Sequence, residues 1–303
     1  MASRQPNQLC FLCPRMCGVF RETRTGEGFC RMGTLPVVAR AALHHWEEPC
    51  VSGSRGTGAV FFSGCTLGCS HCQNTPISQD RFGKMLSVRE LADVFKYLVE
   101  EEGAQTLSLI TPSHFVPAII KALNAYRPQV PVVYNCGGYE RVETIGLLEG
   151  LVDVYLPDFK HASSRLSALM AHAPDYAEAA IPAIQEMCRQ TGPVIFDDLG
   201  IMVRGTLIRH LVLPGCTGDS LKVLDTIKRH FPAGTWVSLM GQYTPQAGCA
   251  IPGLNRRITP REYHRVLNHL NDLELPGYRQ GLSSADAGYT PEFDLTGLGT
   301  GAV

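Results

Sequence analysis

The distribution of hydrophobic and polar residues along the chain predicts strands that alternate with helices. Short apolar, β-prone runs, such as residues 59–62, have the length and composition of buried strands. Longer segments between these runs place apolar residues at helical spacing, as Leu91, Val94 and Leu98 do on one helical face. Strand–helix alternation of this kind implies a parallel sheet with helices outside it.

Six strand–helix units are expected. The strands are predicted at residues 59–63, 106–110, 130–134, 152–156, 207–213 and 235–240. The helices are predicted at residues 87–103, 115–126, 140–148, 175–190 and 218–230, with a last one from residue 259 onward. Capping boxes mark two helix starts, at Ser87 with Glu90 and at Thr259 with Glu262. Residues 193–197 also resemble a strand, but the alternation gives them no place among the core strands.

Three cysteines with C-x3-C-x2-C spacing, Cys65, Cys69 and Cys72, follow the first predicted strand. Gly64 and Gly68 allow the backbone to close tightly around a bulky group. Thiolates favour zinc, copper(I) and iron–sulfur clusters. A closed structural zinc site needs four protein ligands, whereas a 4Fe–4S cube on three thiolates keeps one iron open to a small molecule. The loop is therefore interpreted as a reactive iron–sulfur site, with a zinc or disulfide cluster as the alternative.

A second cysteine group, Cys10, Cys13, Cys17 and Cys30, lies in a stretch rich in Gly and Pro. Such a stretch has too little apolar sequence to order itself, so a bound metal is expected to replace the missing core. Zinc is the simplest assignment, with sulfurs about 3.5–4 Å apart around an ion at ~2.3 Å. A second iron–sulfur cluster and unligated thiols are the alternatives. His44, His45 and Cys50 are either further ligands of one of the two cysteine groups or solvated or packed residues. The isolated cysteines Cys136, Cys188, Cys216 and Cys249 are expected to be small buried hydrophobes.

Composition limits the classes of protein to which the chain can belong. With 303 residues and 45% hydrophobic content, it is long enough for one large α/β domain with a small appendage. A net charge of −1 offers no electrostatic argument for binding nucleic acid or an anionic membrane. Twelve cysteines without a secretory leader predict a reducing, cytoplasmic location, and no apolar run is long enough to span a membrane. The expected division is a Cys-rich module at 1–54, a core at 55–273 and a C-terminal extension at 274–303.

Polar residues collect where the predicted strands end, which is the edge at which active sites gather in barrels of this kind. The candidates on these strand ends are Ser113, Asn135, Asp158, Lys160, Arg209 and Tyr243. A solvated surface pair is the alternative for Asp158 and Lys160, although their position around Phe159 at the end of an apolar strand disfavours it. His210 alternates with Arg209 and is expected to be the packed residue of the two. For His114 and His161 a functional role could not be separated from simple solvation.

The cysteine loop resembles that of the radical S-adenosylmethionine enzymes, whose hallmark is CxxxCxxC after the first barrel strand. The resemblance implies a partial (β/α)6 barrel, a 4Fe–4S cluster on Cys65, Cys69 and Cys72, and S-adenosylmethionine chelated to the open iron. It also implies reductive cleavage to a 5′-deoxyadenosyl radical that abstracts hydrogen. His71 stands before the third cysteine, where the family places a residue beside the adenine.

Within that family the chain is most similar to the pyruvate formate-lyase activating enzyme group, in a branch with an N-terminal Cys-rich module. The shared segments are Cys-Pro-Arg-x-Cys-Gly from Cys13, Trp46-Glu47-Glu48-Pro49, Cys72-Gln73-Asn74, Arg209-His210-Leu211-Val212-Leu213-Pro214-Gly215 and Gln242-Tyr243-x-Pro245. The resemblance places Asp158, Lys160 and Arg209 at S-adenosylmethionine, and it transfers the position, though not the residue type, of the ammonium-binding stretch to Ser113.

Two departures concern the monovalent cation that these activases bind. Asn135 replaces a carboxylate, which weakens the field that holds a bare cation, and Tyr243 replaces a histidine. The resemblance further implies a glycyl radical enzyme or another protein or peptide as substrate, and flavodoxin or ferredoxin as electron donor. The alternatives are a radical enzyme acting on a small metabolite or RNA, and a non-catalytic iron–sulfur or zinc protein.

Overall fold

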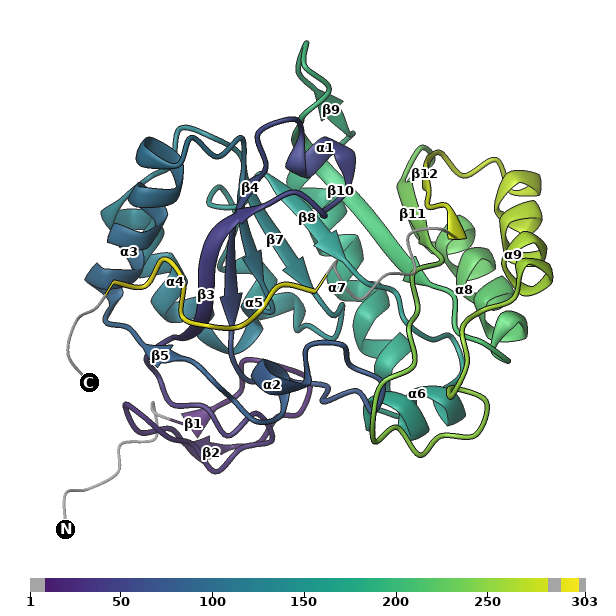
Figure 1. Ribbon diagram of the computed structural model, residues 1–303, viewed down its shortest axis with the longest axis horizontal. Helices are drawn as coiled ribbons and strands as arrows, with labels where there is room; N and C mark the ends of the chain where they lie inside the picture. The colour runs from purple at the N-terminus through teal and green to yellow at the C-terminus, as the bar shows by residue number, and fades with distance from the viewer. Residues whose placement is uncertain (1–8, 283–289, 300–303) are drawn as a thin grey trace.

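A twisted sheet of parallel strands with helices on its outer side forms the body of the molecule (Figure 1). The computed structural model describes residues 9–282 and 290–299. Six parallel strands, β4, β6, β7, β8, β10 and β11, follow one another across the sheet in chain order. The expected α/β class and six-unit partial barrel are therefore confirmed.

The strands are β1 (Leu9–Cys10), β2 (Val19–Phe20), β3 (Val37–His44), β4 (Thr57–Phe62), β5 (Lys84–Met85), β6 (Leu107–Ile110), β7 (Val132–Cys136), β8 (Val154–Pro157), β9 (Ile195–Phe196), β10 (Met202–Leu211), β11 (Trp236–Met240) and β12 (Gly277–Arg279). The helices are α1 (Pro49–Ser52), α2 (Thr75–Ser78), α3 (Val88–Lys96), α4 (Val116–Ala125), α5 (Val142–Gly146), α6 (Ser164–Ala171), α7 (Tyr176–Thr191), α8 (Thr217–His230) and α9 (Pro260–Asp272). A π-helical turn, Tyr97–Glu101, extends α3, and a 3-10 turn, Ser113–Phe115, precedes α4.

Both predicted capping boxes are present. Ser87 Oγ accepts a hydrogen bond from Glu90 N at 3.2 Å, and Glu90 Oε2 accepts one from Ser87 N at 2.7 Å. Thr259 and Glu262 bond in the same reciprocal way at the start of α9. Each box satisfies backbone N–H groups that have no partner within the helix.

Several elements differ from the expectation in extent. β7 ends two residues later than predicted, so that Asn135 and Cys136 belong to the strand. β10 begins at Met202, because its first residues pair antiparallel with β9 in a hairpin that projects from the body (Figure 1). That hairpin accounts for the strand-like residues 193–197. α6 and β12 were not predicted.

The chain before and after the predicted core contributes to the same sheet. β3, within residues 1–54, pairs antiparallel with β4 along most of its length. β12 pairs parallel with β11 at the other edge. In residues 290–299, Leu295 N donates to Ala39 O, and Ala41 N donates to Thr296 O. β3 and residues 290–299 therefore cover the edge of the barrel sheet at β4, and β12 covers the edge at β11.

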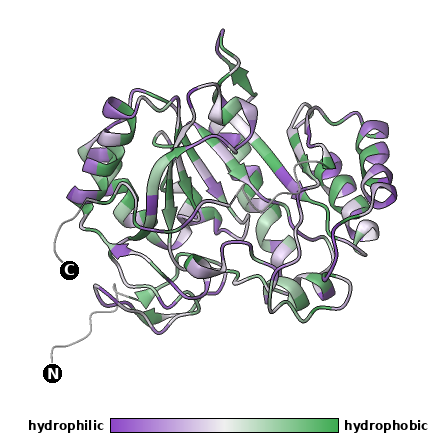
Figure 2. Ribbon diagram, viewed as in Figure 1, coloured by the Kyte–Doolittle hydropathy of each residue, from purple (hydrophilic) through white to green (hydrophobic). Residues whose placement is uncertain are grey.

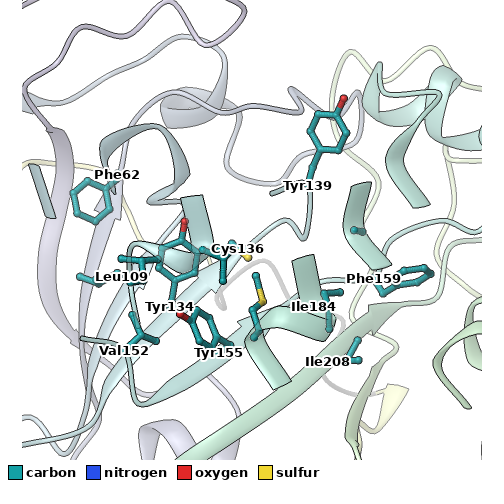
Figure 3. Packing of buried hydrophobic residues seen from close by; sticks show 14 of the residues in the cluster. Phe62, Leu109, Tyr134, Cys136, Tyr139, Val152, Tyr155, Phe159, Ile184 and Ile208 are labelled. Atoms are coloured by element: carbon teal, nitrogen blue, oxygen red, sulfur yellow. The ribbon is translucent and has the colours of Figure 1, made fainter. Parts of the chain in front are cut away.

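Apolar side chains from the strands and the inward helix faces form the main core. Figure 3 shows Phe62, Tyr134, Tyr155 and Ile208 among the buried residues of this core. The hydropathy colouring is green along the strands and purple on the outer turns of α9 (Figure 2). The core holds the parallel strands in register, so their carboxyl ends meet at one edge.

Candidate active site at the carboxyl ends of the strands

The cysteine loop, residues 63–74, leaves the carboxyl end of β4 in a tight turn. Gly64 and Gly68 have φ of 82° and 60°, in the left-handed region that favours glycine. A Cβ on Gly64 would lie 2.3 Å from the Met32 side chain. The two glycines thus let the loop turn directly against the N-terminal segment.

Arg15 ties the N-terminal segment to the cysteine loop and to α6. Its Nε donates to Thr66 O at 2.8 Å, and its Nη2 donates to Ala171 O at 3.2 Å. The guanidinium also stacks on the ring of Phe29, 3.9 Å from the ring centroid. The planar guanidinium donates hydrogen bonds to two segments at once, which a lysine ammonium could not do in the same geometry.

The three thiols of the cysteine loop are neighbours and are largely removed from water. Burial raises the pKa of Cys69 to about 12; Lys160 opposes the rise, and the thiols of Cys65 and Cys72 add to it. Leu67 N donates to Cys65 Sγ at 3.3 Å. A ligand that supplies positive charge would stabilise the thiolates here, because metal ligands must be deprotonated.

A cavity of about 660 Å³ extends from these thiols into the open barrel. The ten residues predicted for the cluster and the cosubstrate all line it: Cys65, Cys69, His71, Cys72, Ser113, Asn135, Asp158, Lys160, Arg209 and Tyr243. They come together because parallel strands β6 to β11 end at the same edge.

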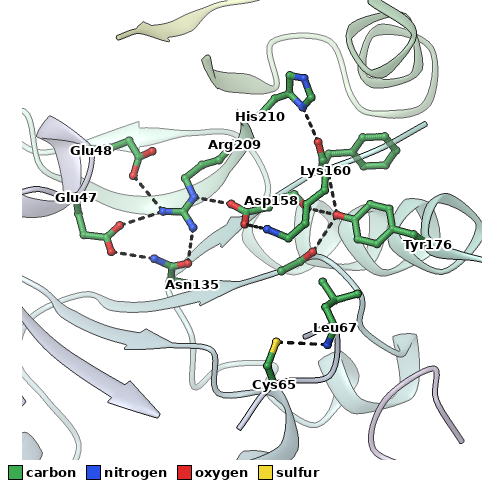
Figure 4. A network of polar contacts seen from close by, with 12 residues as sticks. Glu47, Glu48, Cys65, Leu67, Asn135, Asp158, Lys160, Tyr176, Arg209 and His210 are labelled. Atoms are coloured by element: carbon green, nitrogen blue, oxygen red, sulfur yellow. Dashed lines mark hydrogen bonds and ion pairs between the residues drawn. The ribbon is translucent and has the colours of Figure 1, made fainter. Parts of the chain in front are cut away.

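Asp158 is the centre of a charged network in this cavity (Figure 4). Its carboxylate lies 2.5 Å from Lys160 Nζ and accepts a hydrogen bond from Arg209 Nε at 2.9 Å. Burial alone would raise the pKa of Asp158, but Arg209 and Lys160 outweigh it and hold this pKa below its ordinary value. The carboxylate is therefore ionised, and the solvated surface pair considered for Asp158 and Lys160 is not what forms.

Two further carboxylates, Glu47 and Glu48, reach Arg209 from the segment between β3 and α1. Their Oε2 atoms lie 3.4 and 3.9 Å from Arg209 Nη1. Neither glutamate is among the site residues expected from the sequence, although both belong to the segment Trp46-Glu47-Glu48-Pro49. Nothing in their local pattern marks them, because the contact joins residues 162 positions apart.

Asn135 completes the surroundings of Arg209. Its Oδ1 accepts from Arg209 Nη2 at 2.6 Å, and its Nδ2 donates to Glu47 Oε1 at 2.9 Å. The amide uses its acceptor for the cation and its donor for the carboxylate. A carboxylate at position 135 would repel Glu47. An asparagine here, in place of the aspartate of the activases, is therefore compatible with a glutamate at position 47.

Ser113 lies in the cavity wall and donates its hydroxyl to Glu140. Glu140 is buried, and burial raises its pKa to about 7 although Ser113, Cys136 and Tyr134 all donate hydrogen bonds to it. Glu140 was not predicted. It gives Ser113 a fixed orientation, with the oxygen lone pairs free for another partner.

The rings of His71, His161 and Tyr243 form a second wall of the cavity. His71 lies 6.4 Å from His161 and 6.3 Å from Tyr243 between ring centroids. Burial, with Lys160 and His161, lowers the pKa of His71 to about 3, so its ring is neutral. Tyr243 presents only its ring, since its hydroxyl donates to Leu254 O at 2.7 Å.

The other histidines in question are buried. His210 Nδ1 bonds Phe159 O at 2.8 Å, which agrees with the packed role expected for it. His114 Nε2 bonds Ser63 O at 2.7 Å, and His161 Nδ1 lies 3.4 Å from a carboxylate oxygen of Asp219. With 2% exposure each, His114 and His161 are not solvated loop residues.

The N-terminal cysteines also gather in one region. Burial raises the pKa of Cys13 to about 12, and the thiols of Cys30 and Cys10 contribute to the rise. Burial likewise raises the pKa of Cys30, and the thiols of Cys10 and Cys17 contribute to the rise. Of the residues considered as extra ligands, Cys50 lies instead in a separate apolar cluster.

Within residues 9–282 and 290–299, no three His, Cys, Asp or Glu side chains are arranged to hold a single metal ion. The tetrahedral zinc geometry expected for the N-terminal cysteines is therefore not found in this part of the chain. A 4Fe–4S cube makes a different demand, because each thiolate binds its own iron atom. The donor set of the cysteine loop, the buried thiol of Cys69 beside Lys160 with the half-buried thiols of Cys65 and Cys72, fits such a cluster.

Comparison with known proteins bears on the fold. No family model matches the chain. A radical S-adenosylmethionine methyltransferase from Sphaerobacter thermophilus superposes with a TM-score of 0.50 at 15% identity, over 77% of this chain and 70% of that one. The chain has the fold of the radical S-adenosylmethionine enzymes.

Two other proteins are similar to the chain. An uncharacterized protein of Methanocaldococcus jannaschii is 29% identical over 272 residues, which are 85% of this chain and 73% of that protein. A domain of a pyruvate formate-lyase-activating enzyme from Bacteroides vulgatus covers 56% of this chain and 91% of its own, with a TM-score of 0.38 and 11% identity. A likeness of that size does not decide whether the chain belongs to the activase branch, which stays a prediction.

The helices cover the outer side of the barrel sheet (Figure 1). None of the helices formed by the described residues has the length and apolar character needed to cross a membrane.

Proposed function

We propose that the protein is a radical S-adenosylmethionine enzyme, with a 4Fe–4S cluster on Cys65, Cys69 and Cys72. When bound, such a cluster passes an electron to S-adenosylmethionine, whose cleavage yields a 5′-deoxyadenosyl radical that abstracts hydrogen. The observation that carries the proposal is that three neighbouring thiols, placed by β4, open onto the cavity that also holds Asp158 and Lys160.

The chain's own residues would bind and orient the cosubstrate. Lys160 and Arg209 present cationic groups that Asp158 holds in place. Ser113, held by Glu140, is proposed to contact the methionine part. The neutral ring of His71, with Tyr243, offers an apolar face of the kind on which an adenine stacks.

We further propose a protein or peptide substrate, as for a glycyl radical enzyme activase, with reduced flavodoxin or ferredoxin as electron donor. A reducing, cytoplasmic compartment would keep the cysteines available. The support is the resemblance of the sequence segments around Cys13, Trp46, Asp158 and Arg209 to the activase group.

Anaerobic reconstitution tests the activity itself. The wild-type protein is expected to bind iron and sulfide and to release 5′-deoxyadenosine with dithionite. Cys69→Ala should lose both, while Cys216→Ala, a half-buried cysteine outside both groups, should keep both. Release of 5′-deoxyadenosine by Cys69→Ala would overturn the assignment.

The substrate class is tested by incubating the reconstituted enzyme with candidate glycyl radical enzymes and recording electron paramagnetic resonance spectra. A protein-based radical on the partner supports the activase role. Release of 5′-deoxyadenosine without any partner radical, together with hydrogen transfer from a small metabolite or RNA, would replace it.

A further inference from the structure

The cavity has an acidic end that the proposed function does not use. Glu47 and Glu48 follow β3 and line the cavity on the side of Arg209 opposite Asp158 (Figure 4). They come from a different segment of the chain than the strand-end residues that surround the cysteine loop.

Glu48 carries a buried oxygen without a direct hydrogen bond among the described residues, although the Ser238 hydroxyl is close enough to lower the pKa of this carboxyl. The residue is only 8% exposed, and its Oε2 has no hydrogen-bond partner. Arg209 Nη1 is 3.9 Å away, beyond hydrogen-bond distance. A buried carboxylate oxygen without a donor is costly, so a donor supplied from the cavity would be stabilising.

The charges around this end do not balance within the network. Once Glu47 and Glu48 are ionised, they and Asp158 provide three negative charges, whereas Arg209 and Lys160 provide two positive ones. All three nitrogens of Arg209 are already engaged, Nε with Asp158, Nη2 with Asn135 and Nη1 with Glu47. One further positive charge is therefore accommodated at the Glu47–Glu48 end without leaving an unpaired group.

We infer that Glu47 and Glu48 form a substrate subsite that binds a cationic nitrogen group, a protonated amine or a guanidinium. The inference rests on the proposed function in that it assigns a substrate class to the same cavity. An organic cation with N–H donors fits better than a bare metal ion, because it gives Glu48 Oε2 a hydrogen bond as well as a charge.

Binding at this subsite is coupled to pH. Burial raises the pKa of Glu48 to about 7; Arg209 opposes the rise, and Glu47 adds to it. The other titratable groups that interact with Glu48 are Cys50 on α1 and Tyr278 on β12, and they carry no charge at neutral pH because the pKa of each is raised. A cationic ligand should therefore displace a proton and bind about tenfold more tightly at pH 8 than at pH 6.

The test uses n-butylammonium and n-butylguanidinium as probes and 1-butanol as the neutral control. Binding to the full-length protein is measured by saturation-transfer NMR titration at pH 6 and pH 8, with saturating S-adenosylmethionine present. Both cations are expected to bind and 1-butanol is not. Both cations keep their charge at these two pH values, so any pH dependence belongs to the protein.

Glu48→Gln should weaken binding of both cations at least tenfold and reduce the pH dependence; burial also raises the pKa of Glu47, so part of the dependence should remain. Glu178→Gln, an exposed glutamate on α7, is the matched control and should bind like the wild type. Unchanged cation binding by a folded Glu48→Gln protein, or equal binding of 1-butanol, would overturn the inference. If Glu48→Gln does not fold, Glu47→Gln and the wild-type comparison between pH values decide in the same way.

The outcome is separable from that of the proposed function. Cation binding does not require iron, and it is repeated on protein without the cluster. Loss of S-adenosylmethionine affinity in Glu48→Gln, with cation binding intact, would assign Glu48 to the cosubstrate and overturn the subsite. Failure of 5′-deoxyadenosine release with cation binding intact would contradict the proposed function alone.

Discussion

Arg209 connects the charged residues of the cavity. It bonds Asp158 and Asn135 and pairs with Glu47 and Glu48. Replacing Arg209 by alanine would leave these buried carboxylates without their cation, which costs roughly 3–5 kcal/mol of folding stability. A change in S-adenosylmethionine binding in that variant would therefore not isolate a cosubstrate contact. Asp158→Asn does so better, because the amide keeps the shape of the side chain.

Asp158→Asn is expected to keep the iron–sulfur cluster and to weaken S-adenosylmethionine binding. The loss of a charge-assisted contact costs about 1.5–3 kcal/mol, or roughly ten- to a hundredfold in affinity. Iron content and isothermal titration calorimetry measure the two effects separately. Asp93→Asn, on the exposed face of α3, should change neither. Unchanged affinity in Asp158→Asn would remove this residue from the cosubstrate site.

At the scale of elements, the N-terminal segment supports the cysteine loop. Met32 occupies the space beside Gly64, and Arg15 bonds the loop backbone at Thr66. Arg21 adds a bond to His114 O at 2.7 Å, next to the end of β4. The loop is thus packed between this segment and the strand ends. Substitutions in the segment are therefore expected to disturb binding of the cluster.

Arg15→Ala should destabilise the protein by about 1.5–3 kcal/mol, since hydrogen bonds from a charged donor are lost. It should also lower the iron content after reconstitution, because Thr66 lies between Cys65 and Cys69 in the loop. Chemical denaturation and iron analysis measure these effects. Arg24→Ala, exposed on the same segment, serves as the control and should resemble the wild type. Equal stability of both variants would show that the Arg15 contacts are not needed.

The N-terminal cysteines are predicted to hold a metal of their own. In the Cys65/Cys69/Cys72 triple alanine variant, metal analysis should find residual iron if Cys10, Cys13, Cys17 and Cys30 bind a second cluster. One zinc per chain would instead restore the initial assignment, with a rearrangement of the thiols on binding. Neither metal in the folded variant would contradict both. Because the pairing of β1 with β2 lies within this region, loss of the metal should destabilise it while the barrel remains folded.

For the molecule as a whole, buried neutral histidines decide how stability responds to acid. Burial lowers the pKa of His44 and His210 to about 4 and that of His71 and His114 to about 3. Below pH 6.5 these histidines bind protons in the unfolded chain, whereas in the folded chain they stay neutral until about pH 4. Their contribution to the free energy of unfolding is therefore complete above pH 6.5 and is lost as the pH falls. Glu48 and Glu140, whose pKa values are raised, act in the opposite direction between about pH 7 and 4.5, as does Glu47, whose pKa burial also raises. Carboxyls whose pKa is lowered in the folded protein, among them Asp158 and Glu262, act in the same direction as the histidines, so we expect net destabilisation by acid.

His210→Gln should reduce that loss. At pH 5 a histidine with a pKa of about 4 accounts for roughly 1.5–2 kcal/mol of lost unfolding free energy. The decline between pH 7.5 and pH 5 in urea unfolding should therefore be smaller in His210→Gln by about that amount. His264→Gln, on the exposed face of α9, is the control and should decline like the wild type. An identical decline in His210→Gln would mean that the ring is protonated without cost.

Much of this architecture follows from local sequence. The spacing of hydrophobic residues predicts where the strands and helices lie. Each capping box is likewise local, because it joins two residues three positions apart. The spacing of Cys65, Cys69 and Cys72 after β4 was sufficient to predict that they lie at the cavity, because parallel strands bring their carboxyl ends together whatever their sequences. Asp158 and Arg209 could be placed there for the same reason.

Only the tertiary structure decided which distant groups meet. Glu47 and Glu48 reach Arg209, Glu140 lies behind Ser113, and β3 joins the barrel sheet although it precedes the predicted core. Burial and charge at these positions come from residues far away in the chain, so no local period or spacing reports them. The sequence by itself determined the barrel and the cysteine loop, and packing across the barrel determined the electrostatics of its cavity.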